Sequence, residues 1–123
     1  MQGNYQKQTN SKMRKAAIYY KDLLAGILTE TNEGDYTFQY EEKYIKEHPK
    51  QFLTFTMPVN HKPYTDKRLF PFFEGLIPEG WLLDIASKNW KINPNDRMGL
   101  LLACCQNCIG AVSVQSIPQE NEE

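Results

Sequence analysis

The 123-residue sequence predicts an α+β domain with a small, mainly antiparallel sheet and about three helices on one side. Three observations lead to this prediction. Apolar and polar residues alternate through much of the first half of the chain, which is typical of strands. After Thr65 the apolar positions take a helical spacing, and one more strand-like segment, "IGAVSV", closes the chain. Strands first, helices next and a returning strand indicate a sheet with helices packed on one of its faces.

The first predicted elements are two strands in "KAAIYYKDLLAGILTE", joined by a turn at Lys21 and Asp22. Gly26 interrupts the second strand, where a glycine suits a bulge or a close backbone approach. The segment "TNEGD" predicts a turn in which Gly34 takes a positive φ. "DYTFQY" follows as a half-buried strand, because its aromatic residues alternate with polar ones. These aromatic residues are Tyr36, Phe38 and Tyr40.

Two further elements are expected before the period changes. "EEKYIKEH" predicts a short polar helix or turn, which Pro49 ends because proline cannot continue a helix. "FLTFTMP" is predicted as another strand. In that strand Leu53, Phe55 and Met57 would occupy one face and the residues between them the other.

The helical part begins with Thr65, which is predicted as the N-cap of a helix in "DKRLFPFFEGL". Asp66 would favour the positive end of that helix. After "IPEG", a second helix is expected in "WLLDIASKNW", and Asn95 is predicted to cap a third in "DRMGLLLACC". The core of this part is expected to contain Phe70, Phe73, Leu76, Leu82 and Ile85.

The chain length predicts a single domain at residues 14–117. A disordered N-terminal extension is expected at 1–13 and a disordered acidic tail at 118–123, because both ends are polar. Fourteen basic and fifteen acidic residues give a net charge of −1 without a basic stripe. This balance argues against direct binding of nucleic acid.

No membrane contact is expected, since no apolar run approaches the ~20 residues that span a bilayer. The N-terminus has no hydrophobic segment of the signal-peptide kind. The three cysteines, Cys104, Cys105 and Cys108, are too few and too clustered for a disulfide scaffold. A cytoplasmic location is therefore predicted.

Catalytic chemistry would need a constellation of residues that the sequence does not contain. There is neither a glycine-rich phosphate loop nor a GxSxG elbow, and His48 and His61 stand in loops far from the cysteines. The carboxylates of Glu74, Glu79 and Asp84 have no complementary partners in the sequence. We expect no enzyme activity, no catalytic residue, no cofactor and no metal.

The pair Cys105 and Cys108 forms a CxxC motif that could hold zinc or exchange thiols. A structural zinc site usually needs a second pair of ligands. The motif also follows a predicted helix, at the end where the dipole disfavours a thiolate. Small buried hydrophobic residues are the competing interpretation, and the role of the cysteines stays open.

Trp81 stands apart from the apolar stripe of its predicted helix. At about 100° per residue, the stripe contains Leu82, Leu83, Ile85 and Trp90, whereas Trp81 falls on the side of Asp84. Two interpretations follow. Trp81 folds back on "FPFF" or Pro78 as a staple at the helix start, or it is an exposed anchor for a partner protein.

Five segments in order, "AGILTE", "FQY", "LTFTMP", "FFEGLIPEG" and "IGAVSV", resemble the N-terminal subdomain of HipA-type serine/threonine kinases. The resemblance covers nearly all of residues 14–116 and implies the fold of that subdomain. The kinase machinery of the family lies in a longer C-terminal portion that the sequence does not include. One departure is "CCQNCIGAV", where family members usually carry a glycine and charged residues.

Some relatives in this family are split into a small HipS protein and a shortened HipT kinase. The resemblance therefore implies a stand-alone, HipS-like antitoxin of a HipBST toxin–antitoxin system. Such a protein binds and inhibits a HipA- or HipT-like kinase, and a HipB-like DNA-binding protein is a possible third member of the complex. A structural accessory that completes the kinase fold and supports its activity is one alternative. A metal or redox module using Cys105 and Cys108 is another.

The resemblance also bears on Trp81, because a detached subdomain must hold its kinase through non-covalent contacts alone. We expect "IPEGW" to form a protruding corner that reaches the nucleotide or substrate cleft of the kinase and blocks it. The expected partner-binding residues are Ile77, Pro78, Glu79, Gly80, Trp81 and Asp84.

Overall fold

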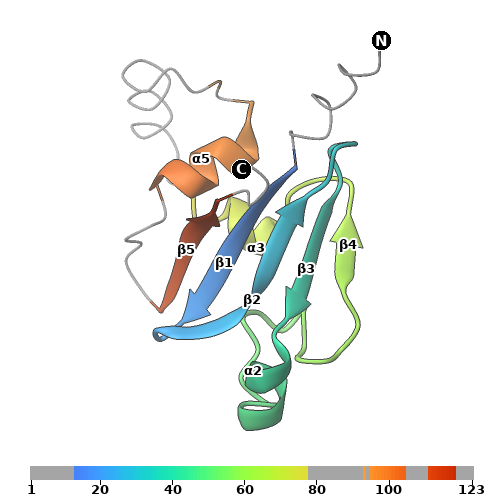
Figure 1. Cartoon of the computed structure of the whole chain (residues 1–123), viewed down its shortest axis with the longest axis vertical. Coiled ribbons are helices and arrows are strands. Elements are labelled where there is room, and N and C mark those ends of the chain that lie inside the picture. Colours follow the sequence, from blue (N-terminus) through green and yellow to red (C-terminus); the bar gives the residue numbers. More distant parts are fainter. Residues whose placement is uncertain (1–12, 78–92, 94, 105–110, 119–123) are drawn as a thin grey trace.

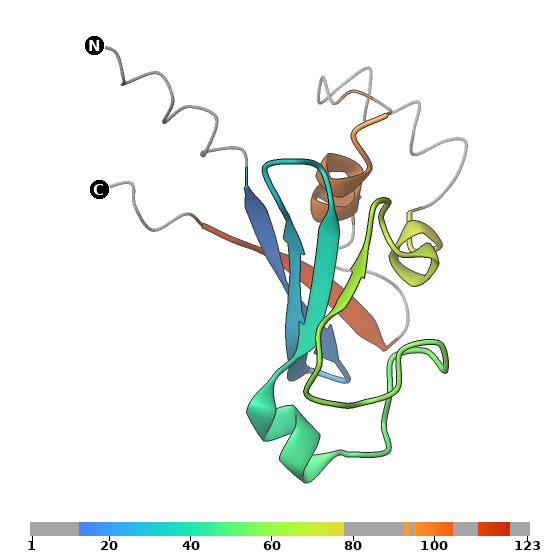
Figure 2. The same cartoon turned by 90° about the vertical axis from the view of Figure 1, so that its right-hand side faces the viewer.

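The computed structural model of the chain describes residues 13–77, 93, 95–104 and 111–118. Five antiparallel strands form one sheet in the order β4-β3-β2-β1-β5 (Figure 1). Helices α3 and α5 lie on the same side of this sheet, and α2 lies at one end of it (Figure 2). The predicted α+β class is confirmed. In chain order the elements are β1 (Arg14–Tyr20), β2 (Leu23–Glu30), β3 (Tyr36–Tyr40), α2 (Glu42–Glu47), β4 (Tyr64–Asp66), α3 (Pro71–Glu74), α5 (Arg97–Cys104) and β5 (Val112–Ile117).

The β1–β2 hairpin is closed by the predicted two-residue turn. Lys21 and Asp22 have φ values of 52° and 69°, the left-handed geometry that suits the twist of a tight hairpin. The register passes from Ile18 opposite Gly26 to Tyr19 opposite Leu24, so one extra residue of β2 forms a bulge. Both features predicted around Gly26, a bulge and a close backbone approach, are confirmed.

The other strands and α2 follow their sequence patterns. In β3 the three alternating aromatic residues are all buried, and the preceding turn has Gly34 at φ 90°. Helix α2 ends before His48, as Pro49 requires. The closing strand β5 pairs with β1, where Val114 lies opposite Ile18. The turn, β3 and α2 are confirmed, and so is a closing strand, although it begins at Val112 and extends three residues beyond the predicted "IGAVSV" to Ile117.

The segment "FLTFTMP" is not a strand, and that prediction is wrong. Leu53 and Met57 are buried, but Phe55 between them is 73% exposed. The hydroxyl of Tyr40 explains this loop, because it donates to the carbonyl oxygen of Met57 (2.6 Å) and accepts from the backbone N–H of Leu53 (3.1 Å). A turn, in which the Met57 N–H donates to the Thr54 carbonyl oxygen, completes it. The alternating pattern thus reports the burial of Leu53 and Met57, two residues that hold the loop against the core, and not a strand.

The prediction that a helix starts at Thr65 is also wrong. Thr65 belongs to β4, which pairs with β3, and Asp66 accepts a hydrogen bond from the Lys67 N–H. Helix α3 begins only at Pro71, whose fixed φ suits the first helical position, and ends at Glu74. Backbone pairing with β3 therefore overrides the capping signal.

Helix α5 is capped by a different residue from the one predicted. The side chain of Asp96, rather than that of Asn95, accepts a hydrogen bond from the Gly99 N–H (3.1 Å). This is the usual N-cap contact, one residue later than expected. The predicted helix "WLLDIASKNW" lies outside the described residues, and so do its core candidates Leu82 and Ile85.

The core lies between the sheet and its helices. Phe38 is fully buried, and its ring centroid is 4.9 Å from that of Tyr40 and 5.7 Å from that of Phe73. Phe70 and Phe73 are buried as predicted, whereas Leu76 is partly buried against the core. Within the described ranges, no helix is long and apolar enough to cross a membrane.

Candidate partner-binding surfaces

The predicted corner begins at a residue that belongs to the core. Ile77 is 3% exposed, so its side chain is enclosed by this chain and does not belong to a protruding surface. The other predicted partner-binding residues fall outside the described residues: Pro78, Glu79, Gly80, Trp81 and Asp84.

The two ends of the segment that contains the predicted corner are held on the same face of the sheet. The segment follows α3 and precedes α5, which lie together on that face (Figure 2). Arg97 in α5 donates to both carboxylate oxygens of Glu74 in α3, with a closest N–O distance of 3.0 Å. Glu74 therefore joins two helices through this ion pair, whereas Glu79 and Asp84, the other two carboxylates considered for acid–base chemistry, lie outside the described residues.

A second ion-pair network attaches α5 to the sheet. The guanidinium of Arg14 donates to Glu30 (2.7 Å) and to both carboxylate oxygens of Asp96 (2.8 and 3.1 Å). The hydrogen bonds that Arg14 donates lower the pKa of Asp96 below its ordinary value. Tyr36 donates to Glu30 (3.2 Å), and burial, reinforced by that carboxylate, raises the pKa of Tyr36 to about 12. Asp96 and Tyr36 therefore each keep one protonation state near neutral pH, which suits a structural network.

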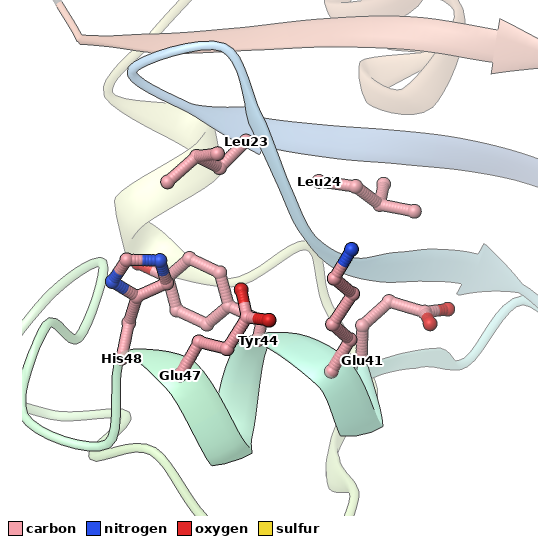
Figure 3. Close-up of a pocket in the computed structure, with 7 residues that line it drawn as sticks. Leu23, Leu24, Glu41, Tyr44, Glu47 and His48 are labelled. Atoms are coloured by element: carbon pink, nitrogen blue, oxygen red, sulfur yellow. The ribbon is translucent and has the colours of Figure 1, made fainter.

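A cavity of about 310 Å³ opens between the start of β2 and α2, and we call it the α2 groove (Figure 3). Leu23 and Leu24 lie above α2 on the strand side, and they are 42% and 37% exposed. The residues that line the groove are Leu23, Leu24, Glu41, Lys43, Tyr44, Glu47 and His48.

The floor of the α2 groove is held in place by Tyr44. This residue is 2% exposed, its ring stacks on that of Tyr40 at 5.9 Å, and its hydroxyl donates to the Gln51 carbonyl oxygen (2.7 Å). The ring of His48 lies 5.2 Å from the Tyr44 ring. The backbone N–H of Glu41 donates to the Ala25 carbonyl oxygen (2.8 Å) and joins the start of α2 to β2. The groove is therefore formed by rigid elements.

Sequence reasoning did not find the α2 groove. Its lining comes from two elements that are separated by about one strand and one turn, and no single segment has an unusual composition. The available signal was the pair Leu23 and Leu24 directly after a tight turn, where polar residues are more usual. Four large apolar residues are markedly exposed in the described part of the chain: Leu23, Leu24, Phe52 and Phe55.

The residues considered for metal or redox chemistry are dispersed or undescribed. His48 lies at the α2 groove, while His61 belongs to the loop before β4, where its carbonyl oxygen accepts from Gln39. In the part of the chain that is described, no three His, Cys, Asp or Glu side chains are grouped to hold a metal ion. Cys105 and Cys108 lie outside that part.

Comparison with known proteins agrees with this architecture. The family described as "HipA N-terminal domain" matches residues 16–115. The chain belongs to the HipA N-terminal domain family. A solved structure, the N-terminal domain of HipA toxin, is similar with a TM-score of 0.67 and 24% identity. The match covers 87% of this chain and 95% of that structure, and it confirms the HipA N-terminal fold.

Two relatives differ in the fraction of their own length that matches this HipA N-terminal domain. An uncharacterized protein of Haemophilus influenzae is 30% identical over 107 residues, which is 87% of this chain and 96% of that protein. A Sinorhizobium fredii protein named "Putative kinase Y4mE" is 24% identical over 110 residues, which is 89% of this chain and 26% of Y4mE. The domain therefore occurs both as nearly all of a small protein and as about a quarter of a longer one.

Proposed function

We propose that this chain is a non-catalytic, HipS-like regulatory protein that binds a separately encoded HipA- or HipT-like serine/threonine kinase and inhibits it. The observation that carries this proposal is the alignment along 96% of the small Haemophilus protein, compared with 26% of Y4mE. The match to the HipA N-terminal domain connects the chain with toxin–antitoxin systems. An antitoxin subunit in the cytoplasm is the role that combines both findings.

The inhibitory contact is proposed to be the corner that follows α3, with Trp81 as its anchor. The Glu74–Arg97 ion pair and the buried Ile77 support this, because they fix the base from which the corner departs. A fixed base reduces the entropy cost of presenting an anchor to a partner. A HipB-like DNA-binding protein would be a third member of the complex.

The test measures autophosphorylation of a HipA-like kinase core from the same organism, with and without an excess of this protein. We expect the activity to fall, and Trp81→Ala to restore it. Phe55→Ala is the matched control, because it removes another exposed aromatic side chain from a loop far along the chain from the corner. No complex and no change in activity would contradict the proposal.

The alternative is an accessory subunit that completes the kinase fold and supports its activity. The similarity to Y4mE favours it, since there the same domain is part of a longer protein that is named as a kinase. The same assay separates the two functions. Inhibition by the added protein indicates an antitoxin, whereas a rise in kinase activity indicates an accessory subunit.

A further inference from the structure

We infer that the α2 groove is a second docking site for the kinase, and that it accepts a segment presenting a large apolar side chain next to a lysine or arginine. This inference rests on the proposed function and deepens it, because it separates the contact that gives affinity from the contact that gives inhibition. Three properties of the groove carry it: its size, its rigidity and its charge.

Size and rigidity indicate that the groove accepts one protruding side chain. Its volume of about 310 Å³ lies at the low end of the ~300–1,000 Å³ that is typical of small-molecule pockets. Leu23 and Leu24 form an apolar wall on the strand side, with Leu23 above the fixed ring of Tyr44 and Leu24 toward Glu41 (Figure 3). Side chains that anchor protein complexes are usually buried in such preformed, well-packed pockets.

The charged residues at the rim of the groove indicate which charge the kinase segment carries beside its inserted apolar side chain. Glu41 and Glu47 contribute two carboxylates, while Lys43 contributes one ammonium group, so the formal balance is negative when His48 is neutral. No ion pair between described residues uses Glu41 or Glu47. A basic group beside the inserted apolar side chain would meet these carboxylates, which gives orientation and a faster encounter rather than most of the affinity.

The groove and the corner are built on different elements. The groove lies between β2 and α2, whereas the corner follows α3 and precedes α5. A kinase that contacts both would be held at two points. Loss of the groove contact should then raise the concentration needed for inhibition without lowering the maximum, while loss of Trp81 should lower the maximum inhibition.

The experiment measures binding of the kinase core to the full chain and its inhibition across a range of concentrations. We expect Leu24→Asp to weaken binding ~10-fold or more and to shift the inhibition curve by the same factor. Glu47→Lys should weaken binding ~3-fold, with an effect that shrinks as salt is added. Both side chains are exposed enough for the substitutions to preserve the fold, which the thermal midpoint checks.

Matched controls come from the same chain. Glu42→Lys makes the same charge change on α2 outside the groove lining, and Phe55→Asp makes the same kind of change to an exposed apolar residue elsewhere. Both should bind the kinase like the unmodified protein. As a readout that needs no variant, the NMR signals of the Leu23 and Leu24 methyl groups should shift when the kinase is added.

The outcomes separate the two proposals. If the unmodified protein does not bind the kinase, the proposed function fails and the groove inference fails with it. If it binds and Leu24→Asp and Glu47→Lys bind equally well, with unshifted leucine methyl signals, only the groove inference is overturned. If Leu24→Asp instead dissolves a self-associated form of the protein, a second copy occupies the groove, and the inferred occupant is wrong.

Discussion

At the scale of single residues, the hydroxyl of Tyr40 organises the longest described loop. It makes two buried hydrogen bonds, to the Leu53 N–H and the Met57 carbonyl oxygen. Tyr40→Phe leaves both backbone groups without this partner, and a buried unsatisfied group costs ~1–3 kcal/mol. We expect the free energy of unfolding to fall by about that amount, measured by urea denaturation, together with faster proteolysis of the loop.

Tyr44→Phe is the control for this prediction. It removes one hydrogen bond, to the Gln51 carbonyl oxygen in a partly buried site, and its expected cost is ~0.5–1.5 kcal/mol. If the two variants unfold at the same urea concentration, the double hydrogen bond of Tyr40 does not hold the loop.

Gly26 is required by packing, whereas Gly75 is not. A Cβ atom at Gly26 would stand 2.5 Å from the Gln39 carbonyl oxygen and 2.6 Å from the Phe38 ring, so strand β3 or the core would have to move. Gly26→Ala should lower the free energy of unfolding by ~1–3 kcal/mol. At Gly75 the φ is −68° and the nearest atom of the described residues would be 3.5 Å away, so Gly75→Ala should be neutral or slightly stabilising. Equal thermal midpoints for the two variants would contradict this account.

At the scale of elements, α5 depends on the charge of Asp96 for its attachment to β1. Arg14 holds the pKa of Asp96 below its ordinary value, so the pair stabilises the fold at neutral pH, and this contribution is lost as the pH falls through the lowered pKa. Asp96→Asn keeps an N-cap side chain but removes the charge. Since both side chains are about one-third exposed, we expect a loss of at most ~1 kcal/mol at neutral pH.

The difference between the unmodified protein and Asp96→Asn should shrink as the pH is lowered. Urea denaturation at pH 7 and at about pH 2.5 measures it. A difference that persists unchanged in acid would mean that Asp96 acts through capping or packing and not through its charge.

The predictability of each element depended on whether a local signal agreed with the tertiary contacts. The β1–β2 hairpin was predictable from its turn residues, which take the left-handed geometry of a tight turn. Strand β3 and the first half of β5 were predictable because their alternating patterns match the burial that the sheet imposes. "FLTFTMP" has the same alternation, but the hydroxyl of Tyr40, thirteen residues from Leu53, organises it as a loop. Thr65 has the chemistry of an N-cap, yet β3 offers its backbone hydrogen-bond partners.

The candidate surfaces were less predictable than the fold. A site that lies within one segment, such as the corner with Trp81, produces a local pattern that sequence reasoning recognises. Even there, the local pattern places Ile77 in the corner, whereas its burial follows from packing that the pattern does not report. The α2 groove needs Leu24 and Glu47 together, and tertiary contacts such as the hydrogen bond from the Glu41 N–H to the Ala25 carbonyl oxygen bring their elements together.

At the scale of the whole molecule, β5 makes the sheet depend on contacts between distant parts of the chain. Strands β1 to β3 are joined by short turns, but β5 pairs with β1, where Lys15 lies opposite Ile117. Strand β1 therefore pairs on one side with β2, its neighbour in the sequence, and on the other side with the distant β5. Val114 in β5 is fully buried, as is Ile18 opposite it in β1.

Removal of β5 should abolish cooperative folding rather than leave a smaller domain that still folds. A chain that ends after Ala111 would expose Ile18 and leave β1 as an unprotected edge strand, which favours aggregation. A chain that ends after Pro118 retains every pair between β1 and β5 and serves as the control. We expect the longer variant to keep the thermal midpoint of the unmodified protein and the shorter one to show no cooperative transition by circular dichroism. A cooperative transition in the shorter variant would mean that the β1–β2–β3–β4 meander and its helices form the folding unit, with β5 as an addition.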